Sequence, residues 1–149
     1  MNFERIKLIR EKNELTQMKM AEMLNIKRSA YSLWEINKNI IPLLKLNEFC
    51  NIFNLSIDYV VGLSDIKEKK LIFCELSIKE VGKRFKQVRK ELNLTQVKLA
   101  KKFNTTHSAI SAYENGITLI PTIFLIEFSK LSKVSLDFLC GKTNDKKIY

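Results

Sequence analysis

The chain has 149 residues, three cysteines and a formal net charge of +10, from 26 Lys and Arg against 16 Asp and Glu. This charge favours a polyanionic partner such as nucleic acid or an anionic membrane surface. No apolar run is long enough for a membrane span, the N-terminus lacks an apolar signal core, and three cysteines without a C-x-x-C pair argue against a disulfide scaffold. We therefore expect a soluble, cytoplasmic protein without membrane contact, in which Cys50, Cys74 and Cys140 are buried thiols.

The sequence contains a gapless internal repeat. Residues 15–35, LTQMKMAEMLNIKRSAYSLWE, correspond to residues 94–114, LTQVKLAKKFNTTHSAISAYE, and a shift of 79 positions aligns Arg5 with Arg84 through to Gly62 with Gly141. Two copies at this period favour tandem domains of about 60 residues over a solenoid array. The predicted organisation is a first domain at 1–63, a linker at 64–79, a second domain at 80–142 and a basic tail at 143–149.

Three helices are predicted in the first part of the first copy. The first helix follows an Asn2 cap and fades near Asn13, and Thr16 caps the second. Asn25 tolerates the left-handed backbone of a sharp turn, after which the third helix spans about 27–35. Apolar residues recur at helical spacing and should face the core, namely Phe3, Ile6, Ile9, Met20, Ala21, Leu24, Tyr31 and Trp34.

Two further helices complete each copy. Pro42 suits the first turn of a fourth helix, and Ser56 caps a short fifth helix that ends at Gly62. The second copy begins with a capping box from Ser77 to Glu80. Its later helices are expected at 95–103, 106–114, 121–131 and 135–140. The fourth helix of the first copy should bury Leu43, Leu46, Phe49 and Phe53. The predicted fold class is all-α, with two tandem five-helix domains joined by an apolar linker that is helical or packed.

The third helix of each copy presents small or basic residues outward. At about 100° per residue, its outward residues lie opposite the buried Tyr31 and Trp34. A helix of this kind can enter the major groove of DNA, although such residues can equally be ordinary solvated surface. The outward residues are Arg28, Ser29, Ser32 and Leu33 in the first copy and His107, Ser108, Ser111 and Ala112 in the second.

The combined motifs resemble one family. Both copies contain L-T-Q-x-x-x-A, an Asn four residues after the Ala, a short helix ending in an aromatic residue and Glu, a Pro-started fourth helix, and a final S-[IL]-D-[YF]. This pattern is similar to the phage-repressor helix-turn-helix family, also called Cro-like or Xre-like. The resemblance implies that the outward residues read base edges and that partly buried ion pairs join Arg10 to Glu35 and Arg89 to Glu114. The phosphate contacts are expected from Gln17, Lys27, Lys38, Gln96 and Thr106, with the backbone near Gly116.

The resemblance implies a sequence-specific regulator of transcription that binds double-stranded DNA, as a repressor, through the third helix of each copy. The alternative is a protein-interaction module, antitoxin-like or an anti-repressor adaptor, in which one or both repeats have lost operator binding. No enzyme, cofactor or metal site is expected, because the one histidine, His107, has no Cys or carboxylate placed to orient it and neither a Gly-rich phosphate loop nor zinc-ligand spacing is present.

The two copies differ in ways that affect these expectations. The second has Thr105 where the first has Ile26, and His107 where the first has Arg28, a stronger guanine reader. Residues 80–141 nevertheless carry 10 basic and 5 acidic side chains, against 9 and 7 in residues 1–63. We therefore expect the second copy to bind DNA with less base readout, or to serve dimerisation or ligand sensing.

The linker contains an apolar run that should not remain in water. It either packs back on a repeat or forms a homodimer contact, and the fifth helix is another candidate for such a dimer. The residues are Leu71, Ile72, Phe73, Cys74 and Leu76.

Overall fold

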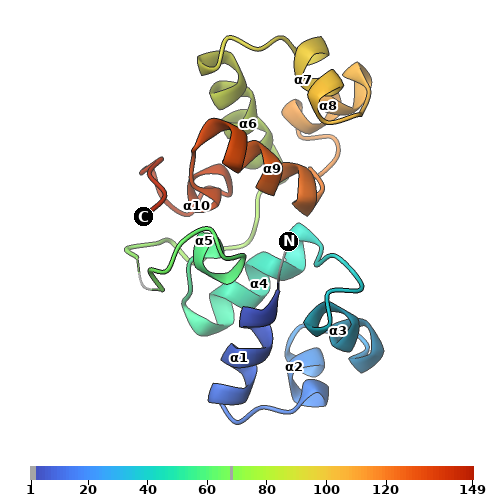
Figure 1. Ribbon diagram of the computed structural model, residues 1–149, viewed down its shortest axis with the longest axis vertical. Coiled ribbons are helices and arrows are strands. Elements are labelled where there is room, and N and C mark those ends of the chain that lie inside the picture. The colour runs from blue at the N-terminus through green and yellow to red at the C-terminus, as the bar shows by residue number, and fades with distance from the viewer. Residues whose placement is uncertain (1–2, 68) are drawn as a thin grey trace. The chain divides into compact units, whose positions relative to one another are not determined.

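The computed structural model describes residues 3–67 and 69–149, and the regular secondary structure of this part is entirely helical (Figure 1). The chain divides into two compact units, one reaching Lys69 and the other spanning Lys70–Ile148. The expected all-α fold with two tandem domains is therefore confirmed. The boundaries predicted at 63, 79 and 142 stay predictions. Within the described residues, no helix combines the length and apolar character that a membrane crossing requires.

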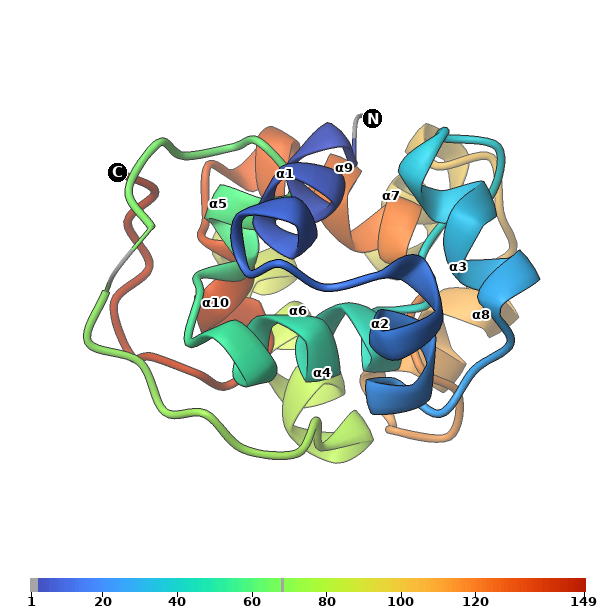
Figure 2. The same cartoon turned by 90° about the horizontal axis from the view of Figure 1, so that it is seen from below.

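Each unit contains five helices within its described residues. The first unit comprises α1 (Glu4–Lys12), α2 (Gln17–Met23), α3 (Arg28–Glu35), α4 (Leu43–Phe53) and α5 (Ile57–Val60). The second comprises α6 (Ile78–Glu91), α7 (Gln96–Lys102), α8 (His107–Glu114), α9 (Thr122–Ser132) and α10 (Leu136–Leu139). Figure 2 shows from a second direction how a short turn connects α2 to α3.

The helix ends follow the caps that the sequence predicts. The Thr16 hydroxyl oxygen accepts from the Lys19 backbone N–H at 3.0 Å, and Ser56 caps α5 in the same way. Asn25 has a φ of 53°, and the following N–H, of Ile26, donates to the Ala21 carbonyl at 3.0 Å, which closes the end of α2. The predicted cap at Asn2 lies outside the described residues.

The second unit opens with half of the predicted capping box. The Ser77 hydroxyl oxygen accepts from the Glu80 N–H at 3.2 Å. The Glu80 carboxylate accepts from Arg84 Nε at 2.8 Å, so this side chain pairs along the helix. Backbone Asn104, with a φ of 51°, repeats the left-handed turn of the first unit. The two units therefore share their turn geometry as well as their sequence pattern.

The predicted core is confirmed with one exception. Every residue predicted to face inward in the first three helices is buried, as are the first three of the four predicted in α4, whereas Phe53 is half-buried. In the second unit the rings of Phe85 and Phe128 pack with centroids 4.5 Å apart, which joins α6 to α9. This burial fixes which side of α3 and α8 faces outward.

Of the two forms expected for the linker, the helical one is wrong, because residues 69–77 form no helix. The apolar run is largely exposed on the single chain, since Ile72 is 65% and Phe73 is 38% exposed, and a homodimer contact through it stays a prediction. Cys74 is also exposed, so only Cys50 and Cys140 are buried thiols.

Backbone contact holds this segment in place. The Ile72 N–H donates to the Lys142 carbonyl at 2.8 Å, and the Lys142 ammonium lies 5.1 Å from the centre of the Phe73 ring. Leu71 and Leu76 are half-buried. The segment is thus attached to the second unit through the backbone of Ile72 and through the ring of Phe73.

Candidate nucleic-acid interface

The outward face of α3 is a short, polar surface. Tyr31 and Trp34 lie on the opposite side of the helix, where they are buried and pack edge to face with ring centroids 6.0 Å apart. The Ser32 hydroxyl donates to the Ser29 carbonyl at 3.0 Å, so its oxygen remains able to accept from a ligand. The outward face comprises two exposed residues followed by two half-buried ones: Arg28, Ser29, Ser32 and Leu33.

The outward face of α8 has the same layout with different chemistry. Ile110 and Tyr113 are buried behind it. Asn115 Nδ2 donates to the Ser111 hydroxyl oxygen at 3.3 Å near the end of the helix. The face begins with an imidazole in place of a guanidinium and ends with a methyl group. Its members, again two exposed and two half-buried, are His107, Ser108, Ser111 and Ala112.

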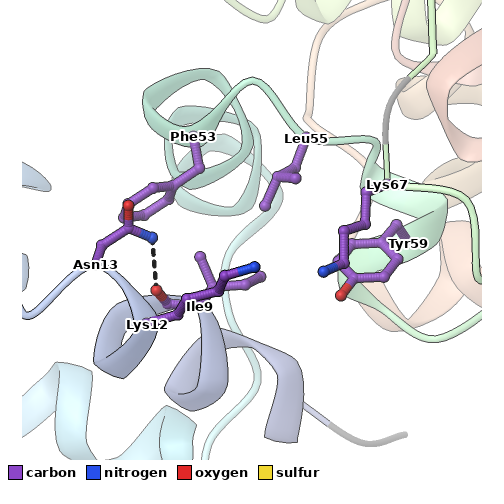
Figure 3. A pocket seen from close by; sticks show the side chains of 7 residues that line it. All are labelled: Ile9, Lys12, Asn13, Phe53, Leu55, Tyr59 and Lys67. Atoms are coloured by element: carbon purple, nitrogen blue, oxygen red, sulfur yellow. Dashed lines mark hydrogen bonds between the residues drawn. The ribbon is translucent and has the colours of Figure 1, made fainter.

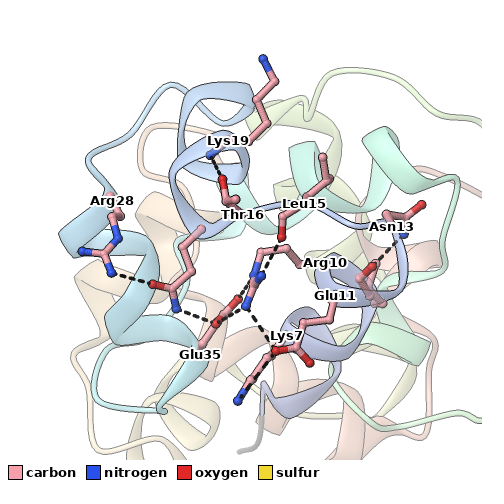
Figure 4. A network of polar contacts seen from close by, with 11 residues as sticks. Lys7, Arg10, Glu11, Asn13, Leu15, Thr16, Lys19, Arg28 and Glu35 are labelled. Atoms are coloured by element: carbon pink, nitrogen blue, oxygen red, sulfur yellow. Dashed lines mark hydrogen bonds and ion pairs between the residues drawn. The ribbon is translucent and has the colours of Figure 1, made fainter.

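A buried ion pair fixes the end of α3 against α1 (Figure 4). Arg10 Nε donates to Glu35 Oε1 at 2.6 Å, and Arg10 Nη2 donates to Glu35 Oε2 at 3.1 Å. Arg10 Nη1 also donates to the Leu15 carbonyl at 2.7 Å. The two side chains are only 10% and 2% exposed. This two-pronged geometry sets both the distance and the rotation of α3 relative to α1.

The electrostatics of Glu35 follow from this arrangement. Burial by itself favours the protonated carboxyl group, but the hydrogen bonds donated by Arg10 and Gln17 outweigh it and hold the pKa of Glu35 below its ordinary value. The hydrogen bond to Glu35 likewise raises the pKa of Arg10. Both groups therefore carry their charges in the folded protein at neutral pH.

Gln17 connects this buried pair to the outward face. Its Nε2 donates to Glu35 Oε2 at 2.8 Å, and its Oε1 accepts from Arg28 Nη2 at 3.4 Å. The first contact is short and partly buried, whereas the second is long and exposed. Sequence reasoning assigned Gln17 to a phosphate and missed this linking position. The signal that could have found it is the separation of 18 residues between Gln and Glu in both copies.

The second domain builds the same network from its own residues. Arg89 Nε donates to Glu114 Oε1 in a short contact, and Arg89 Nη2 donates to Glu114 Oε2 at 3.1 Å. Gln96 Nε2 donates to Glu114 Oε2 at 2.7 Å, and Arg89 Nη1 donates to the Leu94 carbonyl at 2.6 Å. The position that Arg28 holds beside Gln17 belongs here to His107.

The other residues predicted to contact phosphates lie on the surface. Lys27, directly before α3, and Lys38, after it, are exposed. Thr106 is exposed as well, but its hydroxyl oxygen accepts from the Ala109 N–H at 3.1 Å and so caps α8. Gly116 has a φ of 65° at the end of α8, and an added Cβ would lie 2.9 Å from Lys79 Cα. The loop after α8 therefore requires glycine for its conformation and for its packing.

Comparison with known proteins supplies independent information on both halves. A family model described as helix-turn-helix domain matches residues 3–66, and one described as helix-turn-helix matches residues 85–139. No solved structure matches the chain detectably.

Three curated relatives are similar to part of the chain. The uncharacterized HTH-type transcriptional regulator YobD of Bacillus subtilis is 31% identical over 68 residues, 46% of this chain and 61% of the relative. The immunity repressor protein of Bacillus phage phi105 is 30% identical over 90 residues, 60% of this chain and 62% of the relative. The HTH-type transcriptional regulator ImmR of Bacillus subtilis is 37% identical over 62 residues, 42% of this chain and 49% of the relative. The chain thus spans about half to three fifths of the length of these relatives.

Proposed function

The chain belongs to the phage-repressor-like helix-turn-helix family, with one such domain in each half, and we propose that it is a transcriptional regulator that binds specific double-stranded DNA sequences. The observation that carries the proposal is the outward face of α3, which a buried network holds in a fixed orientation. The buried network joins Arg10, Glu35 and Gln17, and Arg28 is attached to it only by a long, exposed contact. A face that is fixed before binding loses little conformational entropy when it docks.

In this proposal α3 enters the major groove and Arg28 reads a guanine. A guanidinium can donate two parallel hydrogen bonds to guanine O6 and N7. Its contact with Gln17 at 3.4 Å is long and exposed, so releasing it costs little. Gln17 itself is held by Glu35 at 2.8 Å and remains at the start of α2, where its amide can face a phosphate. Ser29 and Ser32 offer hydroxyl groups for further polar contacts on the same outward face.

The second domain contributes more to affinity than to base discrimination. His107 is a weaker donor than a guanidinium, and Ala112 offers only a methyl contact. The domain has exposed lysines in α6 and α7 that suit phosphates, among them Lys83, Lys90, Lys98, Lys101 and Lys102. Because the two outward faces differ, a chain that uses both would recognise two unlike half-sites. The operator should then be asymmetric. The immunity repressor among the relatives supports repression as the regulatory direction.

The experiment is selection of bound duplexes from a random DNA pool, followed by affinity measurements on the selected sequence. Arg28→Ala should weaken binding by about 1–3 kcal/mol and relax the preference at one base pair. Gln17→Ala should weaken all sequences to a similar degree. His107→Ala is the matched control in the second domain, and it should change base preference less than Arg28→Ala.

Two outcomes would contradict the proposal. If the pool yields no enriched sequence, the chain does not read bases. If Arg28→Ala and Gln17→Ala alter base preference equally, the assignment of base reading to Arg28 and of phosphate contact to Gln17 is wrong. If the chain does not bind DNA at low salt, the alternative of a protein-interaction module is favoured.

A further inference from the structure

The first domain has a pocket (Figure 3), and none of the residues that line it belongs to the outward face of α3. It has a volume of about 390 Å³, within the range of small-molecule sites. Two lysines from separate parts of the unit contribute ammonium groups, and apolar and aromatic side chains supply the walls. No acidic residue is among the seven that line it: Ile9, Lys12, Asn13, Phe53, Leu55, Tyr59 and Lys67.

The repeat provides an internal comparison for this pocket. The shift of 79 positions places Lys67 over Lys146 and Tyr59 over Phe138. Both lysines are held alike, because the Lys67 carbonyl accepts from Ser56 N–H at 3.2 Å and the Lys146 carbonyl accepts from Ser135 N–H at 2.8 Å. Their ammonium groups lie 5.7 Å and 5.5 Å from the centres of the Tyr59 and Phe138 rings. The two domains therefore present a lysine over an aromatic ring at equivalent positions.

The residue facing that lysine is reversed in charge. Lys12 in the first domain corresponds to Glu91 in the second. Both oxygens of the Glu91 carboxylate accept from Lys146 Nζ, at 2.8 and 2.9 Å. Gln87 Nε2 donates to the same carboxylate at 3.0 Å. Hydrogen bonds from Lys146 and Gln87 hold the pKa of Glu91 below its ordinary value. The second domain thus satisfies its lysine with its own carboxylate, at the position where the first domain has a second cation.

We propose that the pocket of the first domain binds a small carboxylate with an apolar body, whose carboxylate sits between Lys12 and Lys67 as the Glu91 carboxylate sits against Lys146. Two ammonium groups on one pocket repel each other, and an anion between them removes that repulsion. Ile9, Phe53 and Leu55 form an apolar wall for the rest of the molecule. This site is separate from the proposed DNA contacts and does not depend on them.

Affinity should be modest. Lys12 and Lys67 are exposed, so salt and water screen their attraction for an anion. We expect a dissociation constant on the order of 1 mM for a single small acid at low ionic strength.

The test is a titration of the full chain with hexanoate, followed by amide resonances in ¹H–¹⁵N NMR spectra. Hexanoate should shift the resonances of Leu55, Tyr59 and Lys67 in a saturable manner. Hexanol has the tail without the charge, whereas acetate and inorganic phosphate have the charge without the tail, and all three should bind at least several-fold more weakly. Equal binding of acetate, phosphate and hexanoate would reduce the site to a nonspecific cation pair and overturn the proposal.

Two reciprocal variants and one control complete the test. Lys12→Glu gives the first domain the residue of the second, and it should weaken hexanoate binding at least tenfold. Lys70→Glu makes the same charge change on an exposed lysine outside the pocket, and it should leave hexanoate binding unchanged. Glu91→Lys should create hexanoate-dependent shifts at Val134 and Phe138. Undiminished binding in Lys12→Glu, or no gain in Glu91→Lys, would overturn the proposal.

Discussion

Replacing Glu35 by alanine should destabilise the first domain by about 3 kcal/mol. Removing one partner of a buried pair typically costs 3–5 kcal/mol, because the remaining charge loses its compensation. Arg10 is 10% exposed and would keep its bond to the Leu15 carbonyl, which places the expected loss at the lower end. For a domain of this size each kcal/mol lowers Tm by about 4–8 °C, so the shift should be about 12–24 °C.

The chain offers a direct reporter for this experiment. Trp34 is the single tryptophan of the sequence and is buried on α3, so its fluorescence follows unfolding of the first domain. Urea and thermal unfolding of the Glu35→Ala variant should be followed by this signal. Glu22→Ala is the matched control, since Glu22 is 61% exposed and forms a surface pair with Lys19 at 3.4 Å, and its effect should stay within about 0.5 kcal/mol. A loss below about 1 kcal/mol in Glu35→Ala would refute the role of the pair in positioning α3.

Three further changes test the packing and the electrostatics. Tyr31→Phe should lower stability by about 1 kcal/mol, because the buried Tyr31 hydroxyl faces the Glu35 carboxylate and helps to hold the pKa of Glu35 below its ordinary value; a gain in stability in urea unfolding followed by Trp34 fluorescence would contradict this. Gly82→Ala should destabilise the second domain by more than about 3 kcal/mol, since the added Cβ would lie 2.2 Å from the Tyr113 carbonyl oxygen, and near-normal thermal unfolding by circular dichroism would contradict it. The pKa of Glu35 in the folded protein is lowered from its ordinary 4.5, so the stability that the ionised Glu35 contributes is fully present above pH 4.5 and is lost as the pH falls through the pKa of the folded state. The urea midpoint should therefore decline below about pH 4.5, and it should decline less in Glu35→Gln.

The helical framework followed closely from the sequence. Helical periodicity determines which residues face the core, and short polar residues such as Thr16 and Ser56 indicate where helices begin. Asn25 was predicted to adopt a left-handed conformation, and its φ of 53° agrees. These features depend on contacts within a few residues, and local sequence is therefore enough to predict them.

Features that depend on distant partners were harder to predict. Ile72 is exposed in a non-helical segment whose backbone bonds to Lys142, a contact that spans 70 positions and leaves no local signal. The double role of Gln17 and the contrast between Lys12 and Glu91 likewise emerge only when helices are brought together. In both cases the repeat contained the information, because the two copies could have been compared position by position.

The central claim is that the outward faces of α3 and α8 bind DNA, and its most direct test is the salt dependence of binding to the selected duplex. If about four to eight phosphates are neutralised, a plot of log affinity against log salt concentration should have a slope of about −4 to −7. Arg28→Ala should lower affinity for the selected duplex much more than affinity for a scrambled one. No binding at low salt, a slope near zero, or equal losses on both duplexes would contradict the account.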